Sequence, residues 1–428
     1  MHMSKSIVSI VKGTIAKKMV EDALNHLGGV KSLIKEGSTV IVKPNGGHEG
    51  PPESSVCTSP AVVKAVIEAL WKANPKKIIL AESAAIGCDT MKCLEVSGIK
   101  KAAEEAGVYD IRDIKSDPDL IRKKIENPRS AIRNIKLPRF LLEADHIVNV
   151  PIFKTHVSMV FTCALKNIKG VVQDPIHGTM HLTNLAAAMM DLWSVIRADL
   201  SIADLIRPLE GYGPHSTGNP VDFGCIVVSQ DPVALDATVC RMIGLPIDDV
   251  DYFKAASERG LGVVDKDKIE IRGNSIEEVY KPLHLPYLKG FAAWPEYNFH
   301  IENACSSCQG LMAFSMAKLK LLGLYDKNKG IDIVLGRKKD IPEGVHFGKD
   351  LILVGDCTKA LKKKLDAAGE SYIFVVGCPP GEPLPYWAIV DRKDQPDLEL
   401  FQQPKIMRKR LEDETDLLLE KLKTQKNE

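Results

Sequence analysis

The sequence predicts an α/β fold built as two domains. Short segments rich in Val and Ile alternate with amphipathic helical segments, which is the pattern of a large mixed or parallel sheet covered by helices. The 428 residues suit two or three domains, and 45% hydrophobic with 26% charged residues is the composition of a globular protein. A connection rich in aromatic residues and proline, 282–295, separates a large domain at 1–290 from a smaller α/β domain at 296–395. Residues 396–428 form a charged tail or helix, either solvated or used for oligomerisation.

In the large domain, strands are predicted at 6–11, 39–43, 77–80, 146–150 and 225–229. A helix at 60–73 joins two of them in a βαβ unit. Thr58 or Ser59 can cap this helix, and Pro60 suits its first turn. Another helix is expected with Asp231 as its N-cap.

In the small domain, strands are predicted at 331–335, 351–354 and 372–376, with a helix near 311–322. Cys357 and Cys378 each follow one of these strands closely. Because parallel strands end on one edge of a sheet, both cysteines are expected to point into one crevice.

Four cysteines of the small domain predict an iron-sulfur site. They are Cys305 and Cys308 in a CSSC motif, Cys357 and Cys378. Four thiolates complete the coordination of a 4Fe-4S cluster, although soft sulfur ligands also bind zinc or copper(I). Structural zinc sites usually have two close pairs of ligands, whereas here single cysteines follow Cys308 after 49 and 70 residues. The spacing favours a cluster over zinc, with unliganded core thiols as the third interpretation.

Charge and composition argue against several partners. The 57 basic residues nearly equal the 56 acidic ones, so no overall field favours nucleic acid. We find no apolar run of about 18 residues and no signal peptide in the sequence, which predicts a cytoplasmic protein without a membrane span. Ten cysteines in such a chain indicate reduced thiols and metal ligands rather than a disulfide framework.

Polar residues follow the strand predicted at 146–150 and mark a candidate site. Lys154 and His156 alternate by two, so on an extended segment they lie on one face, where they could hold an anionic group and transfer a proton. Lys166 and Asn167 follow in the next polar segment. A solvent-facing turn would also explain these residues.

Two further loops are candidates for ligand binding. Lys43 and Asn45 come between a strand and a helix, where backbone amides and the lysine could hold phosphate or carboxylate. The segment 204–214 is expected to be a glycine-containing loop in which Asp204 and Glu210 bind a metal or act as acid and base, or simply form a turn.

Five short motifs together resemble the family catalogued as domain of unknown function 362, whose members are often described as iron-sulfur cluster-binding proteins. The motifs are KPN at 43–45, PxxKTH at 151–156, KNxxG at 166–170, EGxGP at 210–214 and DPVALDA at 231–237. The resemblance covers about residues 5–290 and implies a fold and a cluster more firmly than a substrate.

The small domain departs from that family, in which the cluster commonly lies in a pair of CxxCxxCxxxC motifs. Its CxxC, GxC and GCPP elements, within about residues 300–385, instead resemble the proximal-cluster domain of hydrogenase small subunits. That resemblance implies a flavodoxin-like domain with cysteines at its strand ends.

These features predict an oxidoreductase or electron-transfer protein acting on a small anionic ligand or a partner enzyme. The site residues would be Lys154, His156, Lys166 and Glu210. One cluster moves one electron at a time, so two-electron chemistry would require a ferredoxin or another redox partner. The alternatives are a lyase or isomerase with a structural cluster, and an accessory protein for metal-cofactor maturation.

Overall fold

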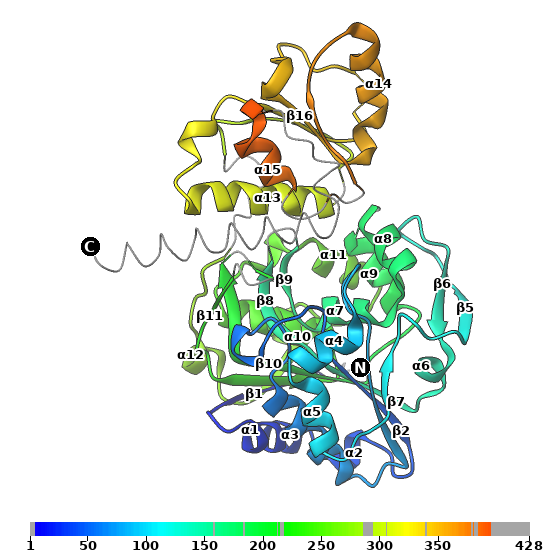
Figure 1. Cartoon of the computed structure of the whole chain (residues 1–428). Coiled ribbons are helices and arrows are strands. Elements are labelled where there is room, and N and C mark those ends of the chain that lie inside the picture. The colour runs from blue at the N-terminus through cyan, green and yellow to red at the C-terminus, as the bar shows by residue number, and fades with distance from the viewer. Residues whose placement is uncertain are drawn as a thin grey trace. The chain divides into compact units, whose positions relative to one another are not determined.

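A computed structural model describes residues 5–156, 159–182, 185–211, 213–214, 218–285, 294–304, 306–338, 340–377, 380 and 384–394 (Figure 1). The chain divides into two compact units, Met1–Leu288 (unit 1) and Lys289–Glu428 (unit 2). Each unit has its own sheet and apolar core.

Unit 1 is built on a mixed sheet that contains eleven strands among the described residues. The main path runs β13-β1-β12-β10-β7-β2-β3-β4, and β8, β9 and β11 join it beside β10. The strands are β1 (Ser6–Lys12), β2 (Thr39–Pro44), β3 (Lys77–Glu82), β4 (Ile111–Asp113), β7 (His146–Val150), β8 (Ile152–His156), β9 (Val160–Thr162), β10 (Leu200–Gly211), β11 (Gly218–Pro220), β12 (Cys225–Ser229) and β13 (Ile269–Gly273). A separate hairpin pairs β5 (Leu120–Lys124) with β6 (Asn134–Pro138). The predicted α/β class with a large mixed sheet is confirmed.

Helices cover both faces of this sheet, as the alternation along its strands requires. Val40 and Val42 of β2 pack in one apolar core with α1, α3 and α5, whereas Ile41 packs in the other core with α7, α9, α10 and α11. The helices of unit 1 are α1 (Ala16–His26), α2 (Val30–Leu33), α3 (Pro60–Trp71), α4 (Thr90–Val96), α5 (Ile99–Glu105), α6 (Arg139–Glu143), α7 (Ala164–Asn167), α8 (Asp174–Leu182), α9 (Leu185–Trp193), α10 (Pro232–Met242), α11 (Asp251–Glu258) and α12 (Ile276–Val279). A 3-10 turn, η2 (Ile168–Val171), continues α7.

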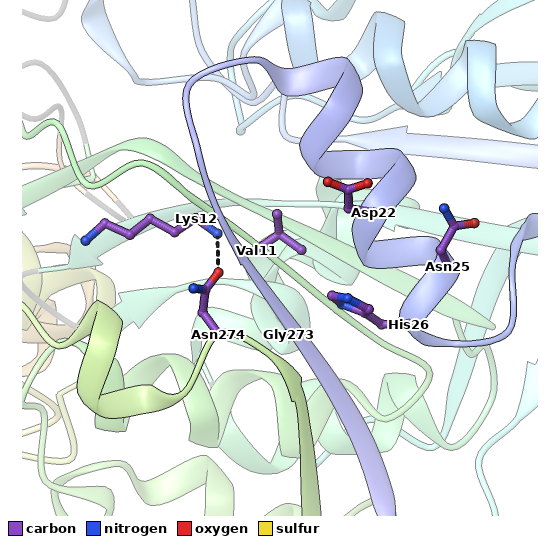
Figure 2. Close-up of a pocket in the computed structure, with 7 residues that line it drawn as sticks. All are labelled: Val11, Lys12, Asp22, Asn25, His26, Gly273 and Asn274. Atoms are coloured by element: carbon purple, nitrogen blue, oxygen red, sulfur yellow. Dashed lines mark hydrogen bonds between the residues drawn. The ribbon is translucent and has the colours of Figure 1, made fainter.

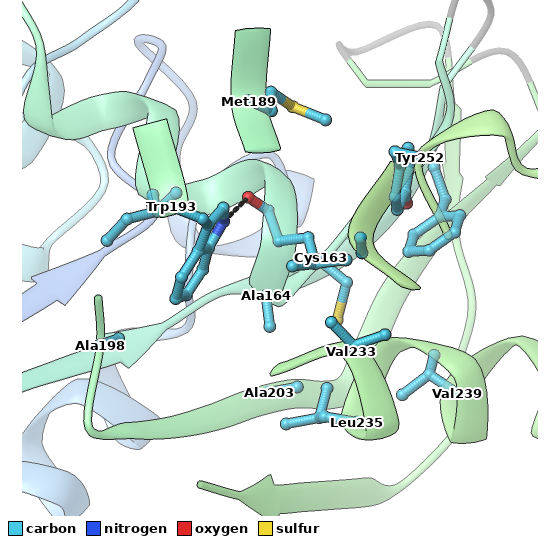
Figure 3. Close-up of a cluster of buried hydrophobic side chains, with 14 of the residues drawn as sticks. Cys163, Ala164, Met189, Trp193, Ala198, Ala203, Val233, Leu235, Val239 and Tyr252 are labelled. Atoms are coloured by element: carbon cyan, nitrogen blue, oxygen red, sulfur yellow. Dashed lines mark hydrogen bonds between the residues drawn. The ribbon is translucent and has the colours of Figure 1, made fainter. Parts of the chain in front are cut away.

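The second core contains the side chains that fix α7 against the sheet (Figure 3). Trp193 is almost fully buried, and its indole Nε1 donates a hydrogen bond of 2.8 Å to the carbonyl oxygen of Leu165. The carboxylate of Asp236, on α10, accepts hydrogen bonds from the backbone amides of Ala164 at 2.8 Å and Leu165 at 2.9 Å. These bonds hold α7, which carries Lys166 and Asn167, in one orientation.

Unit 2 contains a parallel sheet in the order β14-β15-β16-β17. Its elements are β14 (Asn298–Glu302), α13 (Ser306–Leu321), β15 (Asp332–Gly336), β16 (Leu351–Val354), the 3-10 turn η8 (Asp356–Thr358), α14 (Lys359–Ala368), β17 (Ile373–Val375) and α15 (Leu384–Val390). The smaller α/β unit is therefore confirmed. Its described strands follow the order of the sequence, without the reversal of a flavodoxin sheet.

Two local predictions were wrong. The segment 204–214 is not a loop from its start, because β10 extends to Gly211, and Asp204 lies buried within that strand. Ser59 is the N-cap residue of α3, but its side chain makes no capping bond; the carboxylate of Asp204 accepts from the Ser59 amide at 2.9 Å instead. The prediction for Asp231 was correct, because its carboxylate accepts from the amides of Val233 and Ala234 at 2.9 Å.

Candidate functional site

Polar side chains gather at the carboxyl ends of three neighbouring parallel strands, β2, β3 and β7. Lys43 of β2 lies in register with Asn149 of β7, and Glu82 ends β3. All three side chains are buried. Because parallel strands end at the same edge of a sheet, this arrangement brings charged and amide groups into one place.

Lys43 and Glu82 form a buried ion pair. The distance from Lys43 Nζ to Glu82 Oε1 is 2.7 Å, and the two side chains are 1% and 2% exposed. Burial raises the pKa of the Glu82 carboxyl and lowers the pKa of Lys43, while their mutual attraction opposes both shifts. The amides of Gly46 at 2.7 Å and Ser83 at 2.8 Å also donate to Glu82, which favours the ionised carboxylate.

A chain of amide side chains runs from the backbone of Lys43, whose carbonyl oxygen accepts from Asn167 Nδ2 at 3.4 Å, to Lys154. Asn149 Oδ1 accepts from Asn167 Nδ2 at 2.8 Å, and Asn167 Oδ1 accepts from Asn45 Nδ2 at 2.8 Å. Asn45 Oδ1 then accepts from Lys154 Nζ at 3.0 Å, and the carbonyl oxygen of Val56 accepts from the same ammonium at 2.8 Å. The structure thus brings together four residues that the sequence analysis selected: Lys43, Asn45, Lys154 and Asn167.

Two more lysines lie close to this network. Lys166 and Lys169 are partly buried, and repulsion from Lys169 and Lys154 adds to the effect of burial in lowering the pKa of Lys166. Burial lowers the pKa of Lys154 to about 8 and that of Lys169 to about 7. Such lysines can carry a charge for an anion or act as a base near neutral pH.

Gly170 leaves the space that the ion pair occupies. A β-carbon on this residue would lie 2.6 Å from Lys43 Nζ and would also collide with Glu82 Oε1. Real β-carbons are not found at such distances, so a side chain at this position would displace the pair. This explains physically why the KNxxG segment ends in glycine.

His177 holds the backbone of the same region in place through its imidazole ring. It lies on α8, and its Nε2 is 2.7 Å from the carbonyl oxygen of Lys169. Burial lowers the pKa of His177 to about 3, so the ring is neutral near pH 7. Within the described ranges, no group of three His, Cys, Asp or Glu side chains is arranged to hold a metal ion.

The other predicted residues take different positions. His156 ends β8, where the alternation of the strand places it on the face of Lys154. Glu210 lies near the end of β10, and its carboxylate accepts from the amide of His284 at 2.8 Å. Its described hydrogen bond is therefore with a neighbouring segment rather than with the lysine network.

Sequence reasoning missed four residues of this site, and one of them, Lys169, lies within the KNxxG motif but was given no function. Glu82 and Asn149 are polar side chains within otherwise apolar predicted strands, a signal that could have identified them, because a buried polar residue needs a partner. Asp236 lies in the helix that Asp231 caps, and the sequence analysis gave it no function of its own. Asp236 holds α7 through a hydrogen bond with Ala164, which lies 72 residues away in the sequence. Such a contact leaves no local signal.

In unit 2, two of the four predicted cluster ligands lie at the ends of neighbouring elements. Cys308 is on α13, and Cys357 is in η8, immediately after β16. A β-carbon on Gly355 would lie 3.3 Å from Cys308 Sγ, 3.5 Å from Cys357 Sγ and 3.5 Å from the carbonyl oxygen of Gly377. The two sulfurs therefore share the space that glycine leaves open. Cys305 and Cys378 lie outside the described residues.

The ends of β16 and β17 are held together beside these sulfurs. The amide of Asp356 donates to the carbonyl oxygen of Gly377 at 2.8 Å, and the amide of Gly377 donates to Asp356 Oδ1 at 3.0 Å. Gly377 directly precedes Cys378 in the sequence. The predicted relation between Cys357 and the end of a parallel strand is thus present in the fold.

A separate surface groove lies at the other end of the sheet order, between β1, α1 and the segment after β13 (Figure 2). Its volume is about 320 Å³, and its lining includes Lys12, Asp22 and His26. The amide of Lys12 donates to Asn274 Oδ1 at 2.9 Å. These lining residues take no part in the lysine network.

The fold and the site define a mixed α/β domain with a buried, lysine-rich sheet edge. Residues 40–241 match the model of the family described as a domain of unknown function, DUF362, which confirms the family resemblance for this part of the chain. The motifs KPN, PxxKTH and KNxxG supply most of the residues that meet at the site.

Two known proteins show how far the similarity extends. The thylakoid-associated protein sll1697 of Synechocystis sp. is 25% identical over 246 residues, which cover 56% of this chain and 73% of that protein. The solved structure of the lactate racemase apoprotein from Thermoanaerobacterium thermosaccharolyticum aligns with a TM-score of 0.38 and 13% identity. That alignment covers 56% of this chain and 57% of the racemase chain. In the part of our chain that the structure describes, no helix has the length and apolarity to cross a membrane.

Proposed function

We propose that this protein binds a 4Fe-4S cluster and acts as an oxidoreductase or electron-transfer protein on a small anionic ligand or a partner enzyme. The observation that carries the proposal is the meeting of Cys308 Sγ and Cys357 Sγ around Gly355. Thiolates are the ligands that iron-sulfur clusters use, and both sulfurs lie beside the same glycine at the end of β16. These residues therefore fit the group.

Cys305 and Cys378 would complete the ligand set. Each is close in sequence to a residue of the described geometry, since Cys305 lies three positions before Cys308 and Cys378 directly follows Gly377. The similarity to the proximal-cluster domain of hydrogenase small subunits belongs to this proposal. When bound, such a cluster supplies one-electron transfer.

In unit 1, we propose that Lys154, Lys166 and Lys169 hold the anionic group of the ligand. Lys154 is buried, Lys166 and Lys169 are partly buried, and charge repulsion from Lys154 and Lys169 lowers the pKa of Lys166, which places the three ammonium groups close together. An anion bound among these lysines would reduce their mutual repulsion. His156, on the face of Lys154, and Glu210 remain proposed proton-transfer residues.

One observation favours a second function. The pKa of about 8 for Lys154 and about 7 for Lys169 suits a general base near neutral pH. A lyase or isomerase that removes a proton with one of these lysines, and in which the cluster is structural, would use that property directly.

Metal analysis of the purified full chain tests the cluster. After anaerobic purification, iron, sulfide and zinc are quantified, and absorption and electron paramagnetic resonance spectra are recorded before and after dithionite. About four irons and four sulfides per chain with a reducible signal support the redox function. Zinc without sulfide overturns it, and a cluster that resists reduction favours the lyase or isomerase.

Ligand binding tests the lysine site separately. Inorganic phosphate and pyruvate serve as probes in calorimetric titrations at pH 7 and pH 9. Binding that weakens at pH 9, as Lys154 and Lys169 lose their protons, supports an anion site. Equal affinities at both pH values would contradict it. A ferredoxin or partner redox enzyme as electron source, and a cytoplasmic location, remain parts of the proposal.

A further inference from the structure

Two cysteines beside the lysine site have no function in the proposals above. Cys88 and Cys93 flank the first turn of α4, whose N-cap is Asp89. The Asp89 carboxylate accepts from the amide of Lys92 at 3.0 Å, which fixes the start of the helix. Cys88 thus precedes the N-cap, and Cys93 is the fourth helical residue. Side chains at these two positions commonly pack against each other, as in a hydrophobic staple.

The start of α4 places the two thiols as neighbours. Cys88 is the residue before the N-cap and Cys93 is the fourth helical residue, positions whose side chains pack together, and no disulfide joins them. Cys93 is fully buried, whereas Cys88 is partly exposed. A small reagent can therefore reach Cys88 before it reaches Cys93.

The surroundings favour a reactive Cys88. Its Sγ is 3.8 Å from His48 Nδ1, and the ammonium of Lys115 donates to its carbonyl oxygen at 3.0 Å. The hydrogen bond with Cys93, together with the charge of Lys115, lowers the pKa of Cys88 to about 7. The thiolate is the nucleophilic form of cysteine, so this lowered pKa increases the reactive fraction of Cys88 at neutral pH.

We propose that Cys88 and Cys93 form a reversible intramolecular disulfide by exchange with a low-molecular-weight disulfide. The Cys88 thiolate attacks one sulfur of the reagent, and the sulfur-sulfur bond of the reagent breaks to release one thiol. Cys93 then attacks Cys88 Sγ, and its proton passes to the second departing thiolate. The two cysteines lose two electrons and two protons, and the reagent becomes two thiols.

This disulfide would form next to the lysine site. The amide of Ala85 donates to the carbonyl oxygen of Gly47 at 2.9 Å, which joins the Cys88 loop to the loop after β2. Lys115 Nζ donates to the Ala85 carbonyl oxygen at 2.6 Å and forms an ion pair of 3.0 Å with Asp174, the first residue of α8. A covalent link at Cys88 would restrain this rim of the site.

The test uses the full chain, reduced and handled without oxygen. Oxidised glutathione is added at pH 7, remaining thiols are alkylated, and peptides are mapped by mass spectrometry. We expect a Cys88–Cys93 disulfide in the wild type and glutathione retained on Cys88 in Cys93→Ser. Cys93→Ala provides a second variant without a resolving thiol. Cys225→Ser, which removes a buried cysteine of β12, is the matched control and should leave the disulfide unchanged.

Three results would overturn the proposal. They are retention of glutathione on Cys88 in the wild type, a disulfide between Cys88 and Cys57, and an alkylation rate of Cys88 no higher than that of Cys225. We expect Cys88 to react about tenfold faster or more, because its thiolate is more populated and more exposed. Iron and sulfide are measured in the same samples, so a failure of this proposal is distinguished from a failure of the cluster.

Discussion

The polar site of unit 1 and the thiol site of unit 2 are assembled by different means. In unit 1, Lys43 pairs with Glu82, and amide side chains continue the network to Lys154, so the chain itself supplies the partners. In unit 2, Cys308 Sγ and Cys357 Sγ both lie beside Gly355, where a β-carbon would be 3.3 Å and 3.5 Å from them. The first site should therefore depend on its internal pairs, and the second, under the proposed function, on a bound cluster.

Removing a thiol should have the largest effect, because the proposed cluster needs all four of its thiolate ligands. We expect Cys357→Ser to lose most of the bound iron and sulfide. Cys240→Ser removes a fully buried cysteine of α10 in unit 1 and should retain both. Iron and sulfide analysis of the two variants, purified side by side, makes the comparison. Equal cluster content would contradict the assignment of Cys357.

Most of the fold could be predicted because local patterns determine it. The apolar alternation in β2 and the Asp231 cap of α10 are visible in a few consecutive residues. The order of strands in the sheet was not visible, since β1 lies between β12 and β13, more than 200 residues away in the sequence, as the register of Val8 with Ser229 and with Ile271 shows. Pairings over such distances leave no local signal.

The candidate site was predicted residue by residue but not as a network. Lys43, Asn45, Lys154 and Asn167 stood out because they follow apolar strands. Their counter-charge did not, because Glu82 lies at the end of a strand that reads as ordinary core. The segment 204–214 was misjudged because glycine and proline at its end suggested a turn, whereas β-pairing with β8 and then with β11 extends the strand to Gly211.

Breaking the internal pair of unit 1 tests the other half of the comparison. Glu82→Gln leaves the buried ammonium of Lys43 without its carboxylate, which should lower the free energy of unfolding of unit 1 by about 3–5 kcal/mol. Glu105→Gln, which removes the surface partner of Lys64, should change it little. Urea-dependent hydrogen exchange of peptides from β2 and β7 provides the measurement. If both variants lowered the free energy of unfolding by similar amounts, the buried Lys43–Glu82 pair would contribute no more to stability than a surface pair.

The pH dependence of unit 1 should reveal Lys154. Because its pKa is about 8 in the native protein and 10.5 in an exposed chain, the unfolded state binds more protons between these values. Stability therefore rises with pH across this window. At 1.36 kcal/mol per pKa unit, Lys154 contributes about 3 kcal/mol to the rise.

Lys154→Met should reduce that rise by about 3 kcal/mol, with urea-dependent hydrogen exchange measured at intervals from pH 7 to 10.5. Lys64→Met, at an exposed position, should keep the wild-type slope. An unchanged slope in Lys154→Met would mean that this lysine titrates as if it were in water. The same variant should lose phosphate binding, because the ammonium group of Lys154 is proposed to hold the anion.

The smallest expected effect concerns the space that Gly170 leaves for the ion pair. Gly170→Ala adds one methyl group 2.6 Å from Lys43 Nζ, so the pair must move or the turn η2 must shift. Crowding of this kind costs roughly 1–3 kcal/mol in a packed interior. Gly47→Ala is the matched control, because a β-carbon there meets nothing within 4 Å. Gly170→Ala should lower the urea midpoint of β2 peptides and leave the iron content of unit 2 unchanged. If Gly170→Ala were as stable as Gly47→Ala, the Lys43–Glu82 pair would be able to move aside at no cost in free energy. The site of unit 1 would then not depend on the fixed geometry of its internal pair.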